Sequence, residues 1–317
     1  MIEPMKDQNS NTNILHKEHI LQIQNSKIQT TGEELNLKIS CRGNRNLPQS
    51  FFGELFLLVF LFACTQTAKN AKEKERELIL KNNIKCITEY VINMRQGTEE
   101  KEHVNHVKLF NSKGFITQET FFLADGSMDF FATNDYDKND NLILTKAMKP
   151  DSSFFYKETK IYDENNNMIE KAYFEGANDS FFYRNTATYD SKGRMMEYFW
   201  WRPSGLRAKN KYAYDGMKMI ENVEQDKDGK FSSKWIYKYD ENENLIEAVQ
   251  YYPDSIINSK ITYAYNSNNE LVKQTNYYRE TILKMTTFEY DEKNLLIAKT
   301  EYSSAGKISA KFRYEYK

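Results

Sequence analysis

The chain has 317 residues, enough for one large domain or two small ones. Its 44 basic and 45 acidic residues give a net charge of −1, so no strong field points to nucleic acid or to an anionic membrane as a partner. The 12 glycines and 5 prolines are too few for a collagen-like chain or a flexible linker. Three cysteines, an odd number, provide no disulfide framework.

The first segment, residues 1–50, is rich in Asn, Gln and Lys and has little hydrophobic periodicity. Such a segment has no apolar face to bury, so we expect it to be disordered or to be a wrongly assigned leader that the mature protein lacks. No Met lies between Met5 and Met94, so a later translation start would need a different initiator codon.

The longest apolar run is FFGELFLLVFLFAC, from Phe51 to Cys64. It is too short for a transmembrane helix, which needs about 20 residues. Its length suits the apolar region of a signal peptide, and Arg42 and Arg45 supply the preceding positive charge. A buried apolar strand or helix is the alternative interpretation.

The end of this run, "LFAC" from Leu61 to Cys64, resembles the lipobox of bacterial lipoproteins. The resemblance implies that residues 51–64 are a signal peptide and that Cys64 carries lipid as the new N-terminus. It also implies a membrane-anchored protein of the bacterial cell envelope, either periplasmic or surface-exposed. Phe62 is bulkier than usual at its position, and Glu54 is an unusual charge in such a run.

Residues 65–82 are polar and charged, without Gly or Pro, and we expect a tether with some helical tendency. From residue 83 to residue 317 the sequence repeats itself. An aromatic anchor, followed by Asp or Asn in most copies, recurs at intervals of 25 to 27 residues. The anchors are Phe110, Tyr136, Tyr162, Tyr189, Tyr214, Tyr239, Tyr265, Tyr290 and Tyr316.

Each repeat reads as one antiparallel hairpin. Alternate residues before the anchor are aromatic or apolar, as in Trp235, Tyr237 and Tyr239, and this period of two indicates a half-buried strand. The Asp or Asn after the anchor favours a turn, because its side chain can bond the local backbone. A single hairpin is marginal in water, whereas a row of hairpins buries its faces against neighbours.

The repeat resembles the YD repeats of the RHS family, written around YDxxGNL. "YDENENLI" from Tyr239 and "YDSKGRMM" from Tyr189 are the closest copies, although the family's Gly is mostly replaced here and survives only at Gly114 and Gly193. The resemblance implies the repeat architecture, and we carry over nothing about toxicity.

The fold we expect is all-β: one long antiparallel meander of hairpins that curls into an open spiral or half-barrel. Open twisted sheets rarely exceed about 10 strands without curling or splitting. The alternating aromatics should lie on the concave side, and the Asp turns along one rim. A separate hairpin including Ile84–Met94 is expected to cap the start of the array.

The densest aromatic patch contains Tyr198, Trp200, Trp201 and Arg202. Exposed rings of this kind can bind sugars or anchor a protein partner, although burial in the core is the alternative. The acidic turns from Asp137 and Asp240 lack the glycine and the final carboxylate of a calcium loop, so we predict no metal.

We identify no catalytic residues and no cofactor motif. All four histidines, His16, His19, His103 and His106, precede the first strong repeat, and no P-loop, GxGxxG or CxxC occurs. The sequence therefore favours a non-enzymatic, lipid-anchored envelope module that binds or displays a protein or glycan. The alternatives are a structural scaffold without a discrete ligand and, less favoured, a glycan-active enzyme.

The lipobox predicts that a fatty-acid analogue labels the wild-type protein in cells through Cys64. The Cys64→Ser variant should carry no label, because the thiol that accepts the lipid is gone. In-gel detection of the analogue measures this, and equal labelling of the two proteins would contradict the anchor.

Overall fold

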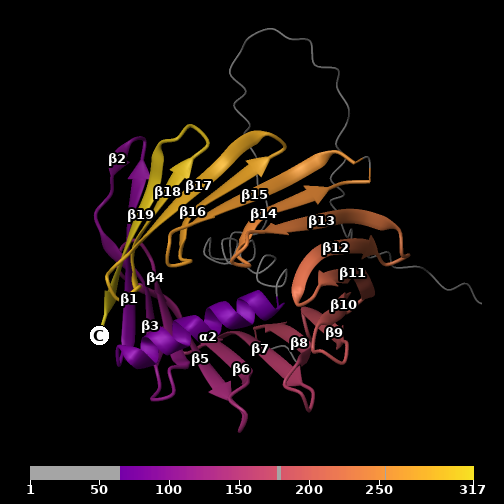
Figure 1. Ribbon diagram of the computed structural model, residues 1–317. Helices are drawn as coiled ribbons and strands as arrows, with labels where there is room; N and C mark the ends of the chain where they lie inside the picture. The colour runs from indigo at the N-terminus through magenta and orange to yellow at the C-terminus, as the bar shows by residue number, and fades with distance from the viewer. Residues whose placement is uncertain (1–64, 177–179, 254) are drawn as a thin grey trace, which may run out of the picture. The chain divides into compact units, whose positions relative to one another are not determined.

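The computed structural model describes residues 65–176, 180–253 and 255–317. The expected leader (1–50), the signal peptide (51–64) and Cys64 lie outside these residues. One helix and 19 strands make up the described chain (Figure 1). They are α2 (Thr65–Lys81), β1 (Cys86–Arg95), β2 (Thr98–Glu99), β3 (His103–Phe110), β4 (Ile116–Phe122), β5 (Met128–Tyr136), β6 (Leu142–Met148), β7 (Phe154–Tyr162), β8 (Met168–Glu175), β9 (Tyr183–Tyr189), β10 (Met195–Arg202), β11 (Gly205–Asp215), β12 (Lys218–Asp226), β13 (Phe231–Tyr239), β14 (Leu245–Tyr251), β15 (Ile257–Tyr265), β16 (Leu271–Tyr278), β17 (Thr281–Tyr290), β18 (Leu296–Ser303) and β19 (Ile308–Tyr316).

The strands form a closed antiparallel barrel. From β3 to β19 each strand pairs with the next one along the chain, as the hairpin repeat predicts. Strand β1 pairs with β3 on one side and with β19 on the other, which completes a wall of 18 strands. The short β2 pairs with the end of β1.

The predicted open spiral or half-barrel is therefore wrong. The hairpin expected at Ile84–Met94 does form, since β1 pairs with β3, but its first strand does not cap an open array. The segment is instead the closing strand, with Ile87 opposite Tyr316 and Asn93 opposite Ala310. At the seam the Lys317 N–H donates to the Cys86 carbonyl at 2.9 Å. An open meander would leave two long edges of unpaired backbone groups, and closure removes both.

The repeat turns lie along one rim, and seven of them share one hydrogen-bond pattern. The first turn residue accepts, through its side-chain Oδ1, the backbone N–H groups two and four residues later. Asp137, for example, accepts from Asn139 at 2.8 Å and from Asn141 at 2.9 Å. The same pattern occurs at Asn111, Asp163, Asp190, Asp240, Asn266 and Asp291.

The residue at the family's Gly position has a positive φ in these turns. Gly193 has φ 75°, and the replacements adopt the same left-handed region, among them Asp140 at 63° and Glu243 at 64°. Asn and Asp tolerate this region better than most residues, so the loss of Gly does not change the turn.

The tyrosine anchors connect each repeat to the previous one. Every anchor hydroxyl from Tyr136 onward donates to the backbone carbonyl that opens the even-numbered strand of the preceding repeat. The pairs are Tyr136 to Ile116 (2.8 Å), Tyr162 to Leu142 (3.0 Å), Tyr189 to Met168 (2.8 Å), Tyr214 to Met195 (2.8 Å), Tyr239 to Met219 (2.7 Å), Tyr265 to Leu245 (2.9 Å), Tyr290 to Leu271 (3.0 Å) and Tyr316 to Leu296 (2.6 Å). We call this set of eight bonds the tyrosine ladder.

The inner face of the barrel holds the alternating aromatics, as expected. Tyr265, Tyr314 and Tyr316 line an internal cavity, and Tyr237 is only 5% exposed. The largest core cluster lies against β9–β14 and includes Met195, Tyr198 and Met219. The repeat thus provides both the strands of the barrel wall and the side chains that pack inside it.

Removing one bond of the tyrosine ladder should lower stability. Tyr189→Phe keeps the ring but leaves the Met168 carbonyl without its hydroxyl donor, so the free energy of unfolding should fall by about 1–2 kcal/mol. Tyr252→Phe, at a side chain that is 45% exposed, is the control and should change it by less than about 0.5 kcal/mol. Urea denaturation measures both, and equal midpoints would contradict a stabilising ladder.

Candidate functional site: the barrel interior

Helix α2 lies across the inside of the barrel (Figure 1). Its last turns pack on the barrel through Leu78 and Ile79, in a cluster with Ile84, Phe110 and Leu295. Ile79 is only 3% exposed, so this contact is part of the hydrophobic core. The segment expected to be a tether is therefore a docked helix over Thr65–Lys81.

A second contact fixes the helix against the turn that follows β3. The guanidinium carbon of Arg76 lies 5.0 Å from the centre of the Phe115 ring. Gly114 lies beneath the helix, and a Cβ there would approach the side chains of Arg76 and Leu80 to 3.1 Å. The glycine thus serves both the left-handed turn, at φ 77°, and the close approach of the helix.

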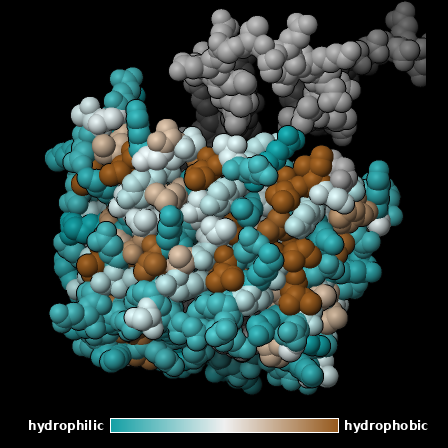
Figure 2. All heavy atoms as spheres, turned by 45° about the horizontal axis from the view of Figure 1, so that its top comes forward, coloured by the Kyte–Doolittle hydropathy of each residue, from teal (hydrophilic) through white to brown (hydrophobic). Residues whose placement is uncertain are grey.

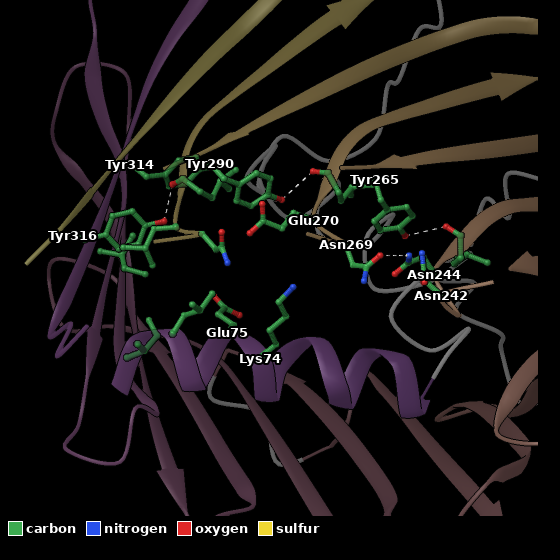
Figure 3. Close-up of a pocket in the computed structure, with 18 of the residues that line it drawn as sticks. Lys74, Glu75, Asn242, Asn244, Tyr265, Asn269, Glu270, Tyr290, Tyr314 and Tyr316 are labelled. Atoms are coloured by element: carbon green, nitrogen blue, oxygen red, sulfur yellow. Dashed lines mark hydrogen bonds between the residues drawn. The ribbon is translucent and has the colours of Figure 1, made fainter. Parts of the chain in front are cut away.

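Between α2 and the barrel wall is a cavity of about 820 Å³. The helix contributes Lys74 and Glu75, while the rings of Tyr265, Tyr290 and Tyr316 come from the wall (Figure 3). Other polar lining residues include Glu89, His106, Lys108, Lys218, Glu243, Asn269 and Glu270. The volume falls in the range of small-molecule sites, about 300–1,000 Å³.

The tyrosines of the cavity offer their rings and not their hydroxyls. Those of Tyr265, Tyr290 and Tyr316 already donate to backbone carbonyls in the tyrosine ladder. Burial, with Glu270 nearby, raises the pKa of Tyr290 to about 12, so its hydroxyl stays protonated. The ring surfaces remain for contact with a ligand.

A charged cluster occupies the inner face of β7 and β8. Glu158 lies 3.0 Å from the Lys160 ammonium and 2.7 Å from that of Lys171, and Lys171 is only 7% exposed. Burial opposes ionisation of Glu158, but the two lysines outweigh it, and the pKa of the carboxyl is lowered. Burial is also the main cause of the lowered pKa of Lys160.

A histidine and a carboxylate form a neighbouring polar contact. His106 Nε2 lies 3.3 Å from Glu119 Oε1, and the imidazole stacks on Phe121 with centroids 4.0 Å apart. Burial opposes ionisation of Glu119, but the contact with His106 helps to lower the pKa of its carboxyl. The arrangement fixes the imidazole from two sides.

The aromatic patch predicted as a site is divided between the two faces of β10. Tyr198, 2% exposed, and Trp200 belong to the inner core cluster. Trp201 lies on the outer face, where its indole N–H donates to Thr186 Oγ1 at 3.2 Å. Arg202 donates to the Phe182 carbonyl at 3.0 Å and lies over the Phe182 ring. Alternation along the strand thus prevents the four side chains from forming one platform.

Within the described residues, no group of three or more His, Cys, Asp or Glu is placed to hold a metal ion. No helix there has the length and apolar character needed to cross a membrane. Cys86 is a free thiol at intermediate exposure in the closing strand.

Sequence reasoning missed the residues that line the cavity. Lys74 and Glu75 lie in the segment expected to be a tether, and their role depends on where α2 docks. Glu270 did leave a signal: the turn that begins at Asn266 has an amide first and a carboxylate fifth, whereas the turns at Asp137, Asp163 and Asp240 have the reverse order.

Comparison with known proteins finds only low structural and sequence similarity. No protein-family model matches the sequence, and no curated protein matches it. A porin-like protein from Bacteroides uniformis is similar over 74% of this chain and 96% of its own, with 11% identity and a TM-score of 0.39. One from Bacteroides vulgatus is similar over 72% and 97%, with 12% identity and a TM-score of 0.26.

The complex TcdB2-TccC3-Cdc42 also has a similar segment. It matches 68% of this chain but only 16% of its own, with 13% identity and a TM-score of 0.23. Likenesses of this size carry no argument about function, and the repeat-family resemblance stays a prediction.

The Glu158 cluster should contribute far more to the free energy of unfolding than an ion pair on the outer face does. Glu158→Gln leaves two buried lysines uncompensated and should lower the free energy of unfolding by about 3–5 kcal/mol. The control, Glu247→Gln, breaks an outward pair with the exposed Lys238 and should lower it by about 0–1 kcal/mol.

The pH dependence gives an independent check. Because the folded pKa of Glu158 is lowered, its stabilisation is complete above the unfolded value of 4.5 and is lost as pH falls through the folded pKa. The difference in melting temperature between wild type and Glu158→Gln should therefore narrow below pH 4.5. A difference independent of pH would contradict an ionised Glu158.

Proposed function

We propose that this protein is a cell-envelope binding protein that holds a small polar ligand, such as a short glycan, inside its barrel. The observation that carries the proposal is the cavity of about 820 Å³ between α2 and the wall. Its lining combines tyrosine rings with carboxylate, ammonium and amide groups, the mixture that sugar-binding sites use for stacking and hydrogen bonding.

The outer face supports a ligand inside the barrel rather than a lipid-facing wall. Outward-facing positions carry cross-strand ion pairs, including Lys238 with Glu247 at 2.7 Å and Lys209 with Glu197 at 3.2 Å. Figure 2 shows a face on which hydrophilic atoms surround separate apolar patches. A wall in contact with lipid would instead carry a continuous apolar band about 25 Å tall.

A small ligand also fits better than a protein partner. A stable protein interface buries about 800 Å² on each side and usually has a cluster of aromatic anchors at its centre. The predicted anchors at Trp200 and Trp201 point to opposite sides of β10. In the cavity, by contrast, aromatic rings and charged groups line the same space.

The envelope location rests on the sequence. The lipobox-like end at Cys64 supports a lipid anchor immediately before α2, so the docked helix would join the anchor to the barrel. In this arrangement the helix that lines the cavity is also the connection to the membrane. A structural scaffold without a ligand is the alternative, and it gives no reason for a polar cavity of this size.

A substitution that fills the cavity should abolish binding. Leu296 lines the cavity, and Leu296→Trp should remove glycan binding by occupying the space. Its neighbour Ile297 is 38% exposed and lies outside the cavity lining, so Ile297→Trp is the matched control and should bind as the wild type does. The measurement is a screen of short envelope glycans by thermal shift and calorimetry, and circular dichroism should show that both variants fold.

The scaffold alternative predicts a different result. If no glycan in the screen stabilises the wild-type protein, or if Leu296→Trp and Ile297→Trp bind equally, the interior is not the binding site.

A further inference from the structure

One turn of the barrel has its acid and amide exchanged. In the ordinary turn the acid comes first and the amide fifth, as in Asp137 and Asn141. There the Asn141 amide donates to Asp137 Oδ2 at 3.0 Å and to Asn166 Oδ1 at 2.9 Å. The carboxylate stays in the turn, and both amide hydrogens have partners.

In the exchanged turn the carboxylate moves to the inner side of the wall. The Asn266 amide donates to Glu270 Oε2 at 2.8 Å, and the Glu270 N–H donates to Asn266 Oδ1 at 2.9 Å. The turn therefore keeps its geometry, while its charge moves from the first residue to the fifth, on a side chain that is one methylene longer. Glu270 is only 6% exposed and lines the cavity.

The second oxygen of this carboxylate has no partner. Glu270 Oε1 is buried and accepts no hydrogen bond within the described part of the chain. In Figure 3, Glu270 extends from the wall into the space that Lys74 and Glu75 enter from α2. A buried carboxylate oxygen without a donor is unfavourable, so the site is chemically incomplete without a ligand or solvent.

The surroundings favour a positively charged donor. Glu75 supplies a second carboxylate from the helix, and among the described residues neither it nor Glu270 has a cation within 4.0 Å. The rings of Tyr265 and Tyr290 line the same cavity, and their hydroxyls are already bonded. Carboxylates beside aromatic rings attract ammonium groups through charge-assisted hydrogen bonds and cation–π contacts.

We infer that Glu270 is the binding point for a protonated amine of the ligand, so that the cavity takes an amino sugar or a similar aminated molecule in preference to a neutral one. This inference rests on the proposed function, since it names the ligand class for the same cavity. Lys74 enters the cavity from the helix and carries a like charge, so it opposes the amine and does not assist it.

Three sugars with the same ring distinguish the effect of the ligand's charge from that of its shape. Glucosamine carries an ammonium group, whereas glucose and N-acetylglucosamine are neutral. Titration calorimetry of the full mature protein at pH 6.5 should show glucosamine binding at least about tenfold more tightly than the other two, the size of one charge-assisted contact. Glu270→Gln keeps an acceptor for Asn266 but removes the charge, and it should abolish this preference while leaving the weak binding of glucose unchanged.

Three further variants sharpen the test. Asn266→Asp combined with Glu270→Asn restores the ordinary turn, so it should fold normally and lose the preference for the amine. Lys74→Met should bind glucosamine as tightly as the wild type or more tightly. Glu247→Gln is the control, since this carboxylate pairs with Lys238 at 2.7 Å away from the cavity lining; the preference should survive.

The possible failures are distinct. Equal affinity for the three sugars, or an unchanged preference in Glu270→Gln, overturns the inference and leaves the proposed function standing if Leu296→Trp still blocks glycan binding. Loss of glucosamine binding in Lys74→Met also overturns it, because it assigns the ligand to the lysine. If none of the three sugars binds, the inference is wrong, and the wider glycan screen decides the proposed function.

Discussion

The structure depends on the bond between each tyrosine anchor and the preceding repeat. The hydroxyl crosses from the end of one odd strand to the carbonyl that opens the even strand of the repeat before it, at 2.6–3.0 Å in all eight copies. Backbone pairing alone would let a strand slip, whereas a bond at a fixed place in every repeat sets the register. Because every repeat has the same register, the sheet curves regularly from strand to strand and closes into a barrel.

Next to the seam of the barrel, the first repeat lacks this bond. Phe110 stands where the first anchor should be and has no hydroxyl. The apolar cluster of Ile79, Ile84, Phe110 and Leu295 lies there, so α2 packs against the region that the tyrosine ladder leaves unsupported. The helix is thus part of the closure, and by lying inside the barrel it also forms one wall of the cavity.

The interior separates two uses of charge. Around Glu158 the carboxylate and the ammonium groups satisfy each other at 2.7–3.0 Å, which suits a structural role. At Glu270 one oxygen is held by the turn and the other is left over. A ligand can be recognised only by groups that have not already formed their hydrogen bonds within the protein. The candidate recognition group is therefore Glu270 and not the larger cluster around Glu158.

The sequence by itself determined the hairpin, the strand order along the chain and the inward face of the aromatics, because spacing and alternation are local properties. Tyr265 and Tyr316 face inward for this reason. It could not determine closure, because the pairing of Cys86–Arg95 with Ile308–Tyr316 joins the two ends of the chain, and no local pattern distinguishes a closing strand from a cap. Nor could it place Glu75, which reaches the cavity only because α2 docks inside the barrel. The exchange of acid and amide at Asn266 and Glu270 was visible in the sequence, but its consequence depended on the tertiary structure. Only the structure shows that Glu270 lines the cavity and that one of its buried carboxylate oxygens has no donor among the described residues.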